Sequence, residues 1–452
     1  MKPSIPKGTR DFTPAQTTRR NYIFDTIKTV FVKYGFQPIE TPAMENLSTL
    51  TGKYGEEGDK LLFKVLNNGD FLAKADADAL AAKDSTRLVT SISKRGLRYD
   101  LTVPFARFVV MNQNELAFPF KRYQIQPVWR ADRPQKGRYQ EFYQCDVDVV
   151  GSDALVFEAE LTQIFDEVFE ALNLAVDIKI NNRKVLAGMA EAAGISDQFM
   201  DMTIAIDKLD KIGMAGVRKE MASKGIGEAA MNKIEQMLQV DSVEALQPLF
   251  ADSEIGQKGL EELTTVFDYL SAGTIKNKVT FDVTLARGLN YYTGCIFEVE
   301  ADTTAYPKLK MGSIGGGGRY DDLTSVFGMK NMSGVGISFG AARIYDVMEE
   351  LELFPKAIEQ SLQIIFIAFD EPTFNYAFRC LNQVRTKGIS AEIYPEPTKM
   401  KKQMKYANAR NVPYVILVGS QEMESGKLSL KNMATGEQLS LRLEEIVARF
   451  SA

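Results

Sequence analysis

Near the start of the chain, hydrophobic residues recur at the spacing of one helix face. The pattern predicts a helix over residues 17–34, which Gly35 is expected to end. Its apolar positions are Ile23, Ile27, Val30, Phe31 and Tyr34. The next stretch, FQPIETPAM, is expected to be extended. Its prolines, Pro38 and Pro42, are compatible with an edge or interface strand.

The middle of the chain alternates between strand-like runs and turn signals, without regular βα crossovers. This pattern predicts an α+β fold with a mostly antiparallel sheet flanked by helices. Residues 71–95, rich in charged and small residues, are expected to form a mobile surface insertion. Residues 186–275 have helical periodicity and little strand signal, which indicates an inserted helical domain. The strand-like runs cover residues 119–130, 139–150, 174–181, 278–285, 291–300 and 334–340.

After a helix predicted at 340–354 and a linker, the tail alternates between strands and helices. This predicts a small α/β domain with a mixed or parallel sheet over residues 361–452. The tail contains 12 Lys and Arg against 9 Asp and Glu, so it is basic within an acidic protein. Its basic residues concentrate in one segment, either as a solvated helix face or as an RNA-facing one. They include Lys399, Lys401, Lys402, Lys405 and Arg410.

Composition excludes several classes of protein. The net charge of −5 excludes a generally basic nucleic-acid coat, and three widely separated cysteines make a disulfide framework or zinc ribbon unexpected. No apolar run is long enough to span a bilayer, and the N-terminus lacks the apolar core of a secretory signal. We therefore expect a cytoplasmic protein with no membrane association.

The 452 residues include no histidine. Chance or lineage bias explains this absence as readily as selection does. Chemically, the absence excludes an imidazole base, a serine-hydrolase triad and an HExxH zinc site.

Four segments concentrate arginine, glycine and tyrosine in ways that a structural core does not need: 97–107, 128–149, 286–299 and 313–323. In the first, Asp100 and Thr102 are two residues apart, so we expect them on one face of a strand. In the second, a strand ends at Trp129–Arg130, enters a polar loop and returns as a strand that alternates outward through Gln144, Asp146 and Asp148.

The glycines allow more than one interpretation. The run at 315–318 lacks the GK[ST] ending of a phosphate loop, so a tight turn between strands is the favoured prediction. Gly336 and Gly340 permit close backbone approach before a helix that could favour anions, although core packing explains them nearly as well.

Four arginines lie within or beside partly apolar segments, where an unpaired guanidinium is unfavourable. A buried salt bridge explains any one of them. Together they favour a polyphosphate or carboxylate ligand. They are Arg130, Arg138, Arg287 and Arg343.

Several motifs resemble those of class II aminoacyl-tRNA synthetases. GFQPIETPAMEN resembles motif 1, the Arg-x-Asp opening with RPQKGRYQEF resembles motif 2, and GISFGAARI resembles motif 3. Within that class, KGTRDFTP, ARGLNYYTG and GGGRYDDL are similar to stretches of histidyl-tRNA synthetases. The resemblance spans nearly the whole chain. It implies a catalytic domain over 1–185 and 276–354, a helical insertion over 186–275 and an anticodon-binding domain over 361–452.

The resemblance also implies an activity, partners and site residues. The family activates histidine with ATP and Mg²⁺ and then esterifies the 3′ end of tRNA(His), without an organic cofactor or protein-bound metal, as a homodimer. Arg130 and Arg287 would be catalytic, and Arg130, Arg138 and Arg343 would bind ATP. Arg133 and Gln135 would meet the tRNA acceptor end. The histidine-binding residues would be Asp100, Thr102, Arg130, Gln144, Asp148, Arg287, Tyr291, Tyr292 and Tyr320.

Three positions depart from the family pattern. Asn290 stands where Asp is more frequent, Ala342 where an acidic residue usually precedes the motif 3 arginine, and Asp322 where glycine is more usual. Two rival functions are a histidine-sensing regulatory subunit of ATP phosphoribosyltransferase and a class II synthetase for glycine, threonine or proline. The retained Arg287, the complete tail and the ARGLNYYTG stretch argue against both.

The resemblance suggests a hypothesis for the missing histidine. An enzyme that charges histidine but contains none could still be translated when charged histidyl-tRNA runs out.

Overall fold

The computed structural model describes residues 2–51, 60–286, 292–359 and 362–450. The chain divides into two compact units, Met1–Leu353 and Phe354–Ala452.

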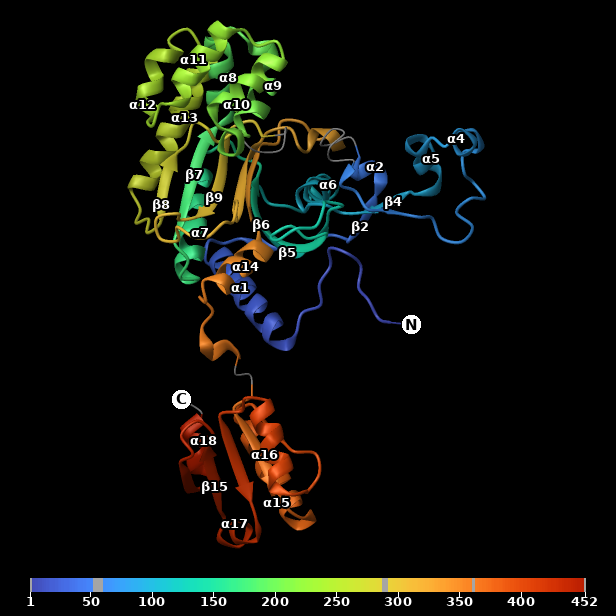
Figure 1. The fold of residues 1–452 in the computed structure, drawn as a ribbon, viewed down its shortest axis with the longest axis vertical. Helices are drawn as coiled ribbons and strands as arrows, with labels where there is room; N and C mark the ends of the chain where they lie inside the picture. The colour runs from blue at the N-terminus through green and yellow to red at the C-terminus, as the bar shows by residue number, and fades with distance from the viewer. Residues whose placement is uncertain (1, 52–59, 287–291, 360–361, 451–452) are drawn as a thin grey trace. The chain divides into compact units, whose positions relative to one another are not determined.

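An eight-stranded sheet forms the centre of the first unit in the described part of the chain (Figure 1). Its strand order is β1-β5-β6-β11-β10-β9-β7-β8. The β1–β5 and β7–β8 pairs are parallel and the other pairs are antiparallel, which confirms the predicted sheet. The strands are β1 (Gln37–Pro38), β5 (Phe120–Trp129), β6 (Glu141–Val150), β7 (Val176–Asn182), β8 (Lys278–Phe281), β9 (Cys295–Ala301), β10 (Gly315–Tyr320) and β11 (Gly334–Phe339).

Strand β10 corrects one sequence-based prediction. The glycine run 315–318 is part of a central strand and not a tight turn. A Cβ on Gly317 would lie 2.1 Å from the carbonyl oxygen of Gly336 in β11, so only glycine lets the two backbones approach this closely.

Three helices pack together along one face of the sheet: α1 (Pro14–Lys33), α7 (Val156–Ala171) and α14 (Ala341–Glu350). Thr13 caps α1 through a capping box with Gln16, and Pro14 occupies its first turn. The buried positions of α1 are the apolar residues expected from the sequence: Ile23, Ile27, Val30 and Phe31.

A buried ion pair joins this helical layer to the sheet. Arg319 of β10 is 4% exposed and Glu158 of α7 is fully buried. The Arg319 Nη2 lies 2.7 Å from Glu158 Oε2, and its Nε donates to Glu158 Oε1. Arg319 Nη1 also donates to Ser333 Oγ at 2.6 Å. The pair fixes the end of β10, immediately before Tyr320.

The segment predicted to be a helical insertion consists of helices, which Figure 1 shows grouped beyond one end of the sheet, near β7 and β9. Glycines allow two of its helices to pack closely, because a Cβ on Gly188 would lie 2.4 Å from the Cα of Gly256. The helices are α8 (Arg183–Ala192), α9 (Phe199–Ile206), α10 (Leu209–Ser223), α11 (Glu228–Leu238), α12 (Val243–Leu246) and α13 (Glu254–Ser271).

A three-stranded sheet and short helices lie beside the main sheet. Residues 71–95, expected to be a mobile insertion, contain two helices capped by Asp76 and Asp84, and the mobility itself stays a prediction. The buried guanidinium of Arg98 donates to the Thr41 and Pro42 carbonyls and so secures the motif 1 segment. The elements are β2 (Met44–Asn46), α2 (Leu47–Leu50), β3 (Lys64–Val65), α4 (Ala77–Ala82), α5 (Ser85–Ile92), β4 (Arg95–Leu97) and α6 (Thr102–Asn112).

The second unit has the predicted α/β alternation around a mixed five-stranded sheet of order β13-β12-β14-β15-β16. The first three strands in this order are parallel, and β14, β15 and β16 pair antiparallel. The sequence pattern did not predict the hairpin β15–β16. The elements are β12 (Ile364–Ala368), α15 (Glu371–Thr386), β13 (Ala391–Ile393), α16 (Met400–Ala409), β14 (Tyr414–Val418), α17 (Ser420–Ser425), β15 (Lys427–Asn432), β16 (Gln438–Arg442) and α18 (Leu443–Phe450).

Within the described ranges, no helix combines the length and apolar character needed to cross a membrane.

Candidate active site

Side chains from neighbouring strands gather over one side of the main sheet. Successive residues of a strand point to opposite sides, so Gln144, Asp146 and Asp148 of β6 share one side. The strand register places Asp146 opposite Ser338 and Asp148 opposite Gly336 of β11. Polar groups far apart in the sequence therefore meet above the middle of the sheet.

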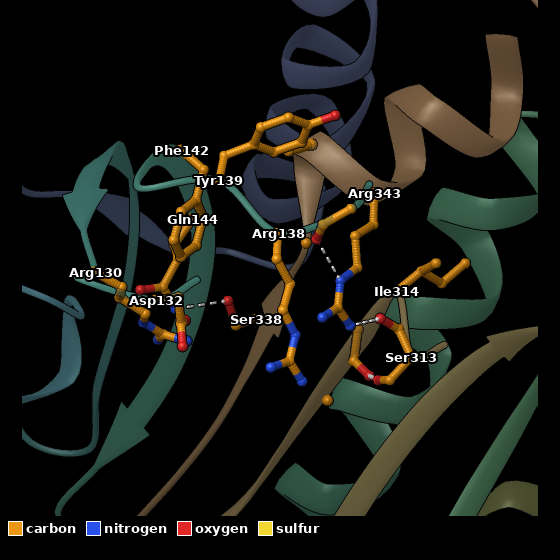
Figure 2. Close-up of a pocket in the computed structure, with 15 residues that line it drawn as sticks. Arg130, Asp132, Arg138, Tyr139, Phe142, Gln144, Ser313, Ile314, Ser338 and Arg343 are labelled. Atoms are coloured by element: carbon orange, nitrogen blue, oxygen red, sulfur yellow. Dashed lines mark hydrogen bonds between the residues drawn. The ribbon is translucent and has the colours of Figure 1, made fainter. Parts of the chain in front are cut away.

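An outer cavity of about 340 Å³ lies here. Figure 2 shows Arg138 and Arg343 projecting into it, Arg138 from the loop after β5 and Arg343 from the first turn of α14. Arg130, just after β5, also lines the cavity. Its described lining residues include three guanidinium groups and one carboxyl group, that of Asp132, so the lining carries a net positive charge. This positive charge suits phosphate groups, which arginine binds in bidentate geometry.

Backbone carbonyl groups orient Arg343. Its Nε donates to Gly137 O at 2.9 Å, and its Nη1 donates to Ser313 O. The preceding residue, Ala342, offers no carboxylate at the position where the family pattern usually has one, and it also lines the cavity.

An inner cavity of about 170 Å³ adjoins the outer one. The two share Arg130, Gln144, Gly316 and Ser338 as a common wall. The inner cavity is also lined by Asp100, Thr102, Asp146, Asp148, Tyr292 and Tyr320. Its carboxyl groups make it suited to cationic groups, in contrast to the arginine-rich outer cavity.

Asp100 and Thr102 line the same cavity, but not as neighbours on a strand. Thr102 begins helix α6, and Asp100 precedes it. The Asp100 carboxylate accepts a hydrogen bond from the backbone N–H of Val103 at 3.3 Å. The strand prediction is wrong here because the chain turns into a helix at this point, and the turn itself brings both side chains to the cavity.

Burial dominates the ionisation of the carboxyl groups. It raises the pKa of Asp100 to about 6, opposed mainly by the charge of Arg130. It raises the pKa of Asp146 to about 7, opposed mainly by Arg122 and supported by the neighbouring charge of Asp148. The pKa of Asp148 is also raised by burial, against the effects of Arg122 and Tyr320.

Asp148 is held by two buried groups. Arg122 Nη2, on a side chain that is 0% exposed, lies 2.8 Å from Asp148 Oδ2. Tyr320 Oη donates to Asp148 Oδ1 at 2.8 Å, and burial keeps the pKa of this phenol well above its ordinary value. Gly336 makes room for the carboxylate, because a Cβ there would lie 1.9 Å from Asp148 Oδ1.

The family model described as histidyl-tRNA synthetase matches residues 69–344, and the one described as anticodon binding domain matches residues 362–452. The chain belongs to the histidyl-tRNA synthetase family. The resemblance noted in the sequence is therefore confirmed.

Relatives match over the full length of this synthetase. A histidine–tRNA ligase of Christiangramia forsetii is 58% identical over 98% of this chain and 97% of its own. One of Bacteroides fragilis is 55% identical over 99% and 98%. These matches establish the enzyme as a histidine–tRNA ligase, which activates histidine with ATP and transfers it to tRNA, and they decide against the two rival functions.

Solved structures agree with this assignment. The histidyl-tRNA synthetase from Nostoc sp. PCC 7120 is 30% identical and has a TM-score of 0.84 over 99% of each chain. A structure described as an ATP phosphoribosyltransferase regulatory subunit/histidyl-tRNA synthetase, from Bacillus halodurans C, has a TM-score of 0.72 over 92% of this chain and 99% of its own. At 20% identity it shows the shared fold alone.

The synthetase brings most of the residues expected from its sequence to the two cavities. Arg133 and Gln135 belong to the loop after β5 and line neither cavity. Arg287, Asn290 and Tyr291 lie outside the described residues.

Sequence reasoning gave no role to two residues of the cavity wall. Asp146 was recognised only as part of an alternating pattern, and Ser338 not at all. The alternation through Gln144, Asp146 and Asp148 was the available signal for Asp146, since it places all three on one side. Ser338 had no comparable signal, because its position depends on the β6–β11 register.

Proposed function

We propose that the inner cavity binds histidine and the outer cavity binds ATP. One observation carries this proposal: the two cavities share a wall that includes Arg130, with carboxyl groups on one side and arginines on the other. The substrate carboxylate and the α-phosphate would meet at this wall. Bringing two reactants together in this way is a major source of rate acceleration.

For histidine, Asp100, Thr102 and Gln144 would bind the α-ammonium and carboxylate groups. Asp148 and Tyr292 would bracket the two imidazole nitrogens, and Tyr320 and Tyr291 would complete the pocket. Asp146 is added to this set because it lines the same cavity at 3% exposure. Buried polar partners of this kind can reject analogues that lack the matching group by roughly 10⁴–10⁵.

In the first step, a histidine carboxylate oxygen would attack the α-phosphorus, forming one P–O bond as the bond to the pyrophosphate breaks. The carboxylate is already ionised at neutral pH, so no imidazole base is needed to create the nucleophile. Arg130 and Arg287 would stabilise charge at the α-phosphate, and Arg138 and Arg343 would hold the β- and γ-phosphates. Removing one preorganised donor of this kind typically costs about 2.7–4 kcal/mol.

Magnesium is expected to enter with ATP. In the described ranges, no group of three or more Cys, Asp or Glu side chains could hold a metal ion. Mg²⁺ is commonly bound through substrate phosphates and one or two carboxylates, so the nucleotide would supply most of its ligands.

The remaining assignments follow the family. Residues 1–185 and 276–354 would form the catalytic domain, 186–275 the helical insertion and 361–452 the domain that reads the anticodon of tRNA(His). Arg133 and Gln135, in a loop that borders the outer cavity, would meet the acceptor end. We also propose a cytoplasmic homodimer, which the family resemblance and its motif 1 segment around Pro42 imply.

ATP–pyrophosphate exchange with each amino acid tests the proposal. We expect exchange with histidine only, and its loss in Arg287→Ala while circular dichroism shows a folded protein. Exchange with another amino acid, or full activity in this variant, would contradict it.

Paired variants test the division into two cavities. Arg138→Ala should raise KM for ATP, whereas Arg87→Ala, at a side chain that is 57% exposed and lines neither cavity, should not. Asp148→Asn should raise KM for histidine, whereas Asp153→Asn, at an exposed position, should not. A rise in KM for the other substrate in either case would refute the division.

A further inference from the structure

We propose that residues 8–12, part of the KGTRDFTP stretch, position the return limb of the motif 2 loop, with Arg10 as the principal residue. The motif 2 loop is defined here as residues 131–140, and its return limb as residues 137–140. The segment contacts the limb next to Arg138, which projects into the outer cavity (Figure 2).

The backbone makes the first contact. The N–H of Gln140 donates to the carbonyl oxygen of Gly8 at 2.8 Å. Gly8 has a φ of +84°, and a Cβ there would lie 2.7 Å from Gln140 Cγ and 2.9 Å from Pro134 Cγ. Glycine is therefore required at this position both by its conformation and by the closeness of the limb.

Arg10 makes the second contact. Its guanidinium carbon lies 3.3 Å from the centroid of the Tyr139 ring, and its Nη1 lies 3.5 Å from Asp346 Oδ1 in α14. Tyr139 Oη donates to Asp346 Oδ2 at 2.8 Å. Arg10, Tyr139 and Asp346 thus form a closed set of three contacts, in which a cation faces an aromatic ring and a carboxylate holds both partners.

These contacts hold the return limb at Gly137 and Tyr139, the residues on either side of Arg138. Figure 2 shows the Tyr139 ring and the Arg138 guanidinium pointing in different directions, with Arg138 reaching into the outer cavity that both residues line. On the other side, Gly137 O accepts from Arg343 Nε. Because α14 carries both Arg343 and Asp346, one helix and the N-terminal segment together fix the backbone of the residue between them.

The consequence for activity is specific. If the limb were free, Arg138 would occupy its ATP-binding position only part of the time, and the apparent affinity for ATP would fall by that fraction. None of residues 137–140 lines the inner cavity, and the limb meets its wall through the backbone, where Gln140 O accepts from the N–H of Arg130 at 2.9 Å. We therefore expect a smaller effect on histidine binding than on ATP binding. The inference rests on the proposed ATP-binding role of Arg138.

The test compares Arg10→Ala with Arg19→Ala in the full-length protein. Arg19 is a matched control because it pairs with Glu349, one turn after Asp346 on α14, and its side chain is 29% exposed against 26% for Arg10. Arg10→Ala should raise KM for ATP in pyrophosphate exchange by about tenfold. It should change KM for histidine by less than about twofold, the bound we take for an unaffected pocket. Arg19→Ala should change neither.

Limited digestion with trypsin supplies a second readout, independent of catalysis. The loop contains two trypsin sites, after Lys136 and after Arg138, since the bond between Arg133 and Pro134 resists trypsin, and cleavage at them requires the loop to leave its ordered position. Arg10→Ala should be cleaved there several times faster than the unmodified protein, and Arg19→Ala at the unmodified rate. Tyr139→Phe, which keeps the ring but removes the bond to Asp346, should give an intermediate rate even if Arg10→Ala proves unstable.

The outcomes separate the inference from the proposed site. A normal KM for ATP in Arg138→Ala would overturn the ATP-binding assignment. A raised KM in Arg138→Ala together with a normal KM in Arg10→Ala would overturn the inference alone. Equal effects of Arg10→Ala and Arg19→Ala, on either readout, would also overturn it, because they would indicate general loosening of the helical layer.

Discussion

Histidine binding should release protons from the inner cavity, and Asp146→Asn should remove most of this release. Asp100, Asp146 and Asp148 lie in one cavity beside the buried guanidinium of Arg122. Burial raises the pKa of each of the three carboxyl groups. The α-ammonium group of histidine would bring positive charge among them, and an opposite charge at this range lowers a carboxyl pKa by about 1–3 units.

The size of the effect follows from the two pKa values. With a pKa of about 7, Asp146 is protonated in about three quarters of empty molecules at pH 6.5. With a pKa of about 6, Asp100 is protonated in about one quarter. The Asp146→Asn variant should therefore release about 0.7 fewer protons per histidine at pH 6.5, and the difference should vanish near pH 8.5, where Asp146 is already ionised.

Isothermal titration calorimetry measures this quantity. Histidine is titrated at pH 6.5 in phosphate and in Bis-Tris, and the dependence of the observed enthalpy on the buffer's ionisation enthalpy gives the protons released. The imidazole of the substrate titrates in the same range, but its contribution is common to both proteins and cancels in their difference. Asp153→Asn serves as the control at an exposed position. Equal proton release by Asp146→Asn and the unmodified protein at pH 6.5 would refute the reasoning.

The same shifts affect the stability of the ligand-free protein. Unfolded aspartate has a pKa of about 3.9, so between that value and about 7 the folded state binds more protons than the unfolded state at Asp100 and Asp146. Their contribution to the free energy of unfolding is therefore complete below about pH 4 and is lost as the pH rises through about 6 and 7. The fall in Tm between pH 5.5 and 8 should be smaller in Asp146→Asn, and an unchanged fall would contradict this account.

Three further predictions concern the fold and the composition. Gly336→Ala should displace the Asp148 carboxylate and raise KM for histidine roughly tenfold or more, which is the loss expected for one hydrogen bond to a charged group. Gly312→Ala should be neutral in the same assay, because its new Cβ would have no neighbouring atom within 4 Å. Glu158→Gln should lower the free energy of unfolding by about 3–5 kcal/mol in urea titrations, because it leaves a buried guanidinium uncompensated, against less than about 1 kcal/mol for the surface residue Glu160. In cells starved of histidine, synthesis of this protein should continue longer than that of a variant with inserted histidines, and equal decline of both would favour lineage bias.

Much of the fold could be predicted because the local spacing of apolar residues indicates which faces of its helices and strands are buried. The apolar spacing of α1 indicates a helix, and the strand and helix patterns that alternate in the C-terminal unit are each typical of one secondary structure. The strand β10 could not be predicted in this way, because its glycines have no side chains to form a pattern. Its strand conformation comes from pairing with β9 and β11, which are distant in sequence.

The hairpin β15–β16 was missed although a signal existed. Leu428 and Leu430 alternate and are buried, and Gly436 has a φ of +76° in the turn that follows. The polar residues between them favoured a loop. For Asp100 and Thr102, spacing alone could not distinguish a strand face from a helix start, since both bring two such residues to one side.

Residue types predicted the chemistry of the site better than its geometry. The arginines indicated a polyphosphate or carboxylate ligand, whereas the cationic group suited to the inner cavity follows from the structure. The separation of arginines and carboxyl groups into two adjoining cavities depends on the order of β6, β11 and β10 in the sheet, which no local pattern contains. The role of Arg10 is similarly hidden, because its partners lie more than a hundred residues along the chain.

The absence of histidine is compatible with this site because arginines supply its positive charge and a tyrosine supplies a hydrogen-bond donor, so neither function needs an imidazole. Arginines hold one charge state at all physiological pH values, and burial keeps the pKa of the Tyr320 phenol far above them, so it remains a hydrogen-bond donor to Asp148. An imidazole in the pocket would titrate together with the imidazole of the substrate and would present a second ring of the same hydrogen-bonding character. A pocket built from carboxylates, phenols and guanidinium groups would recognise histidine by complementarity, without requiring a histidine residue of its own.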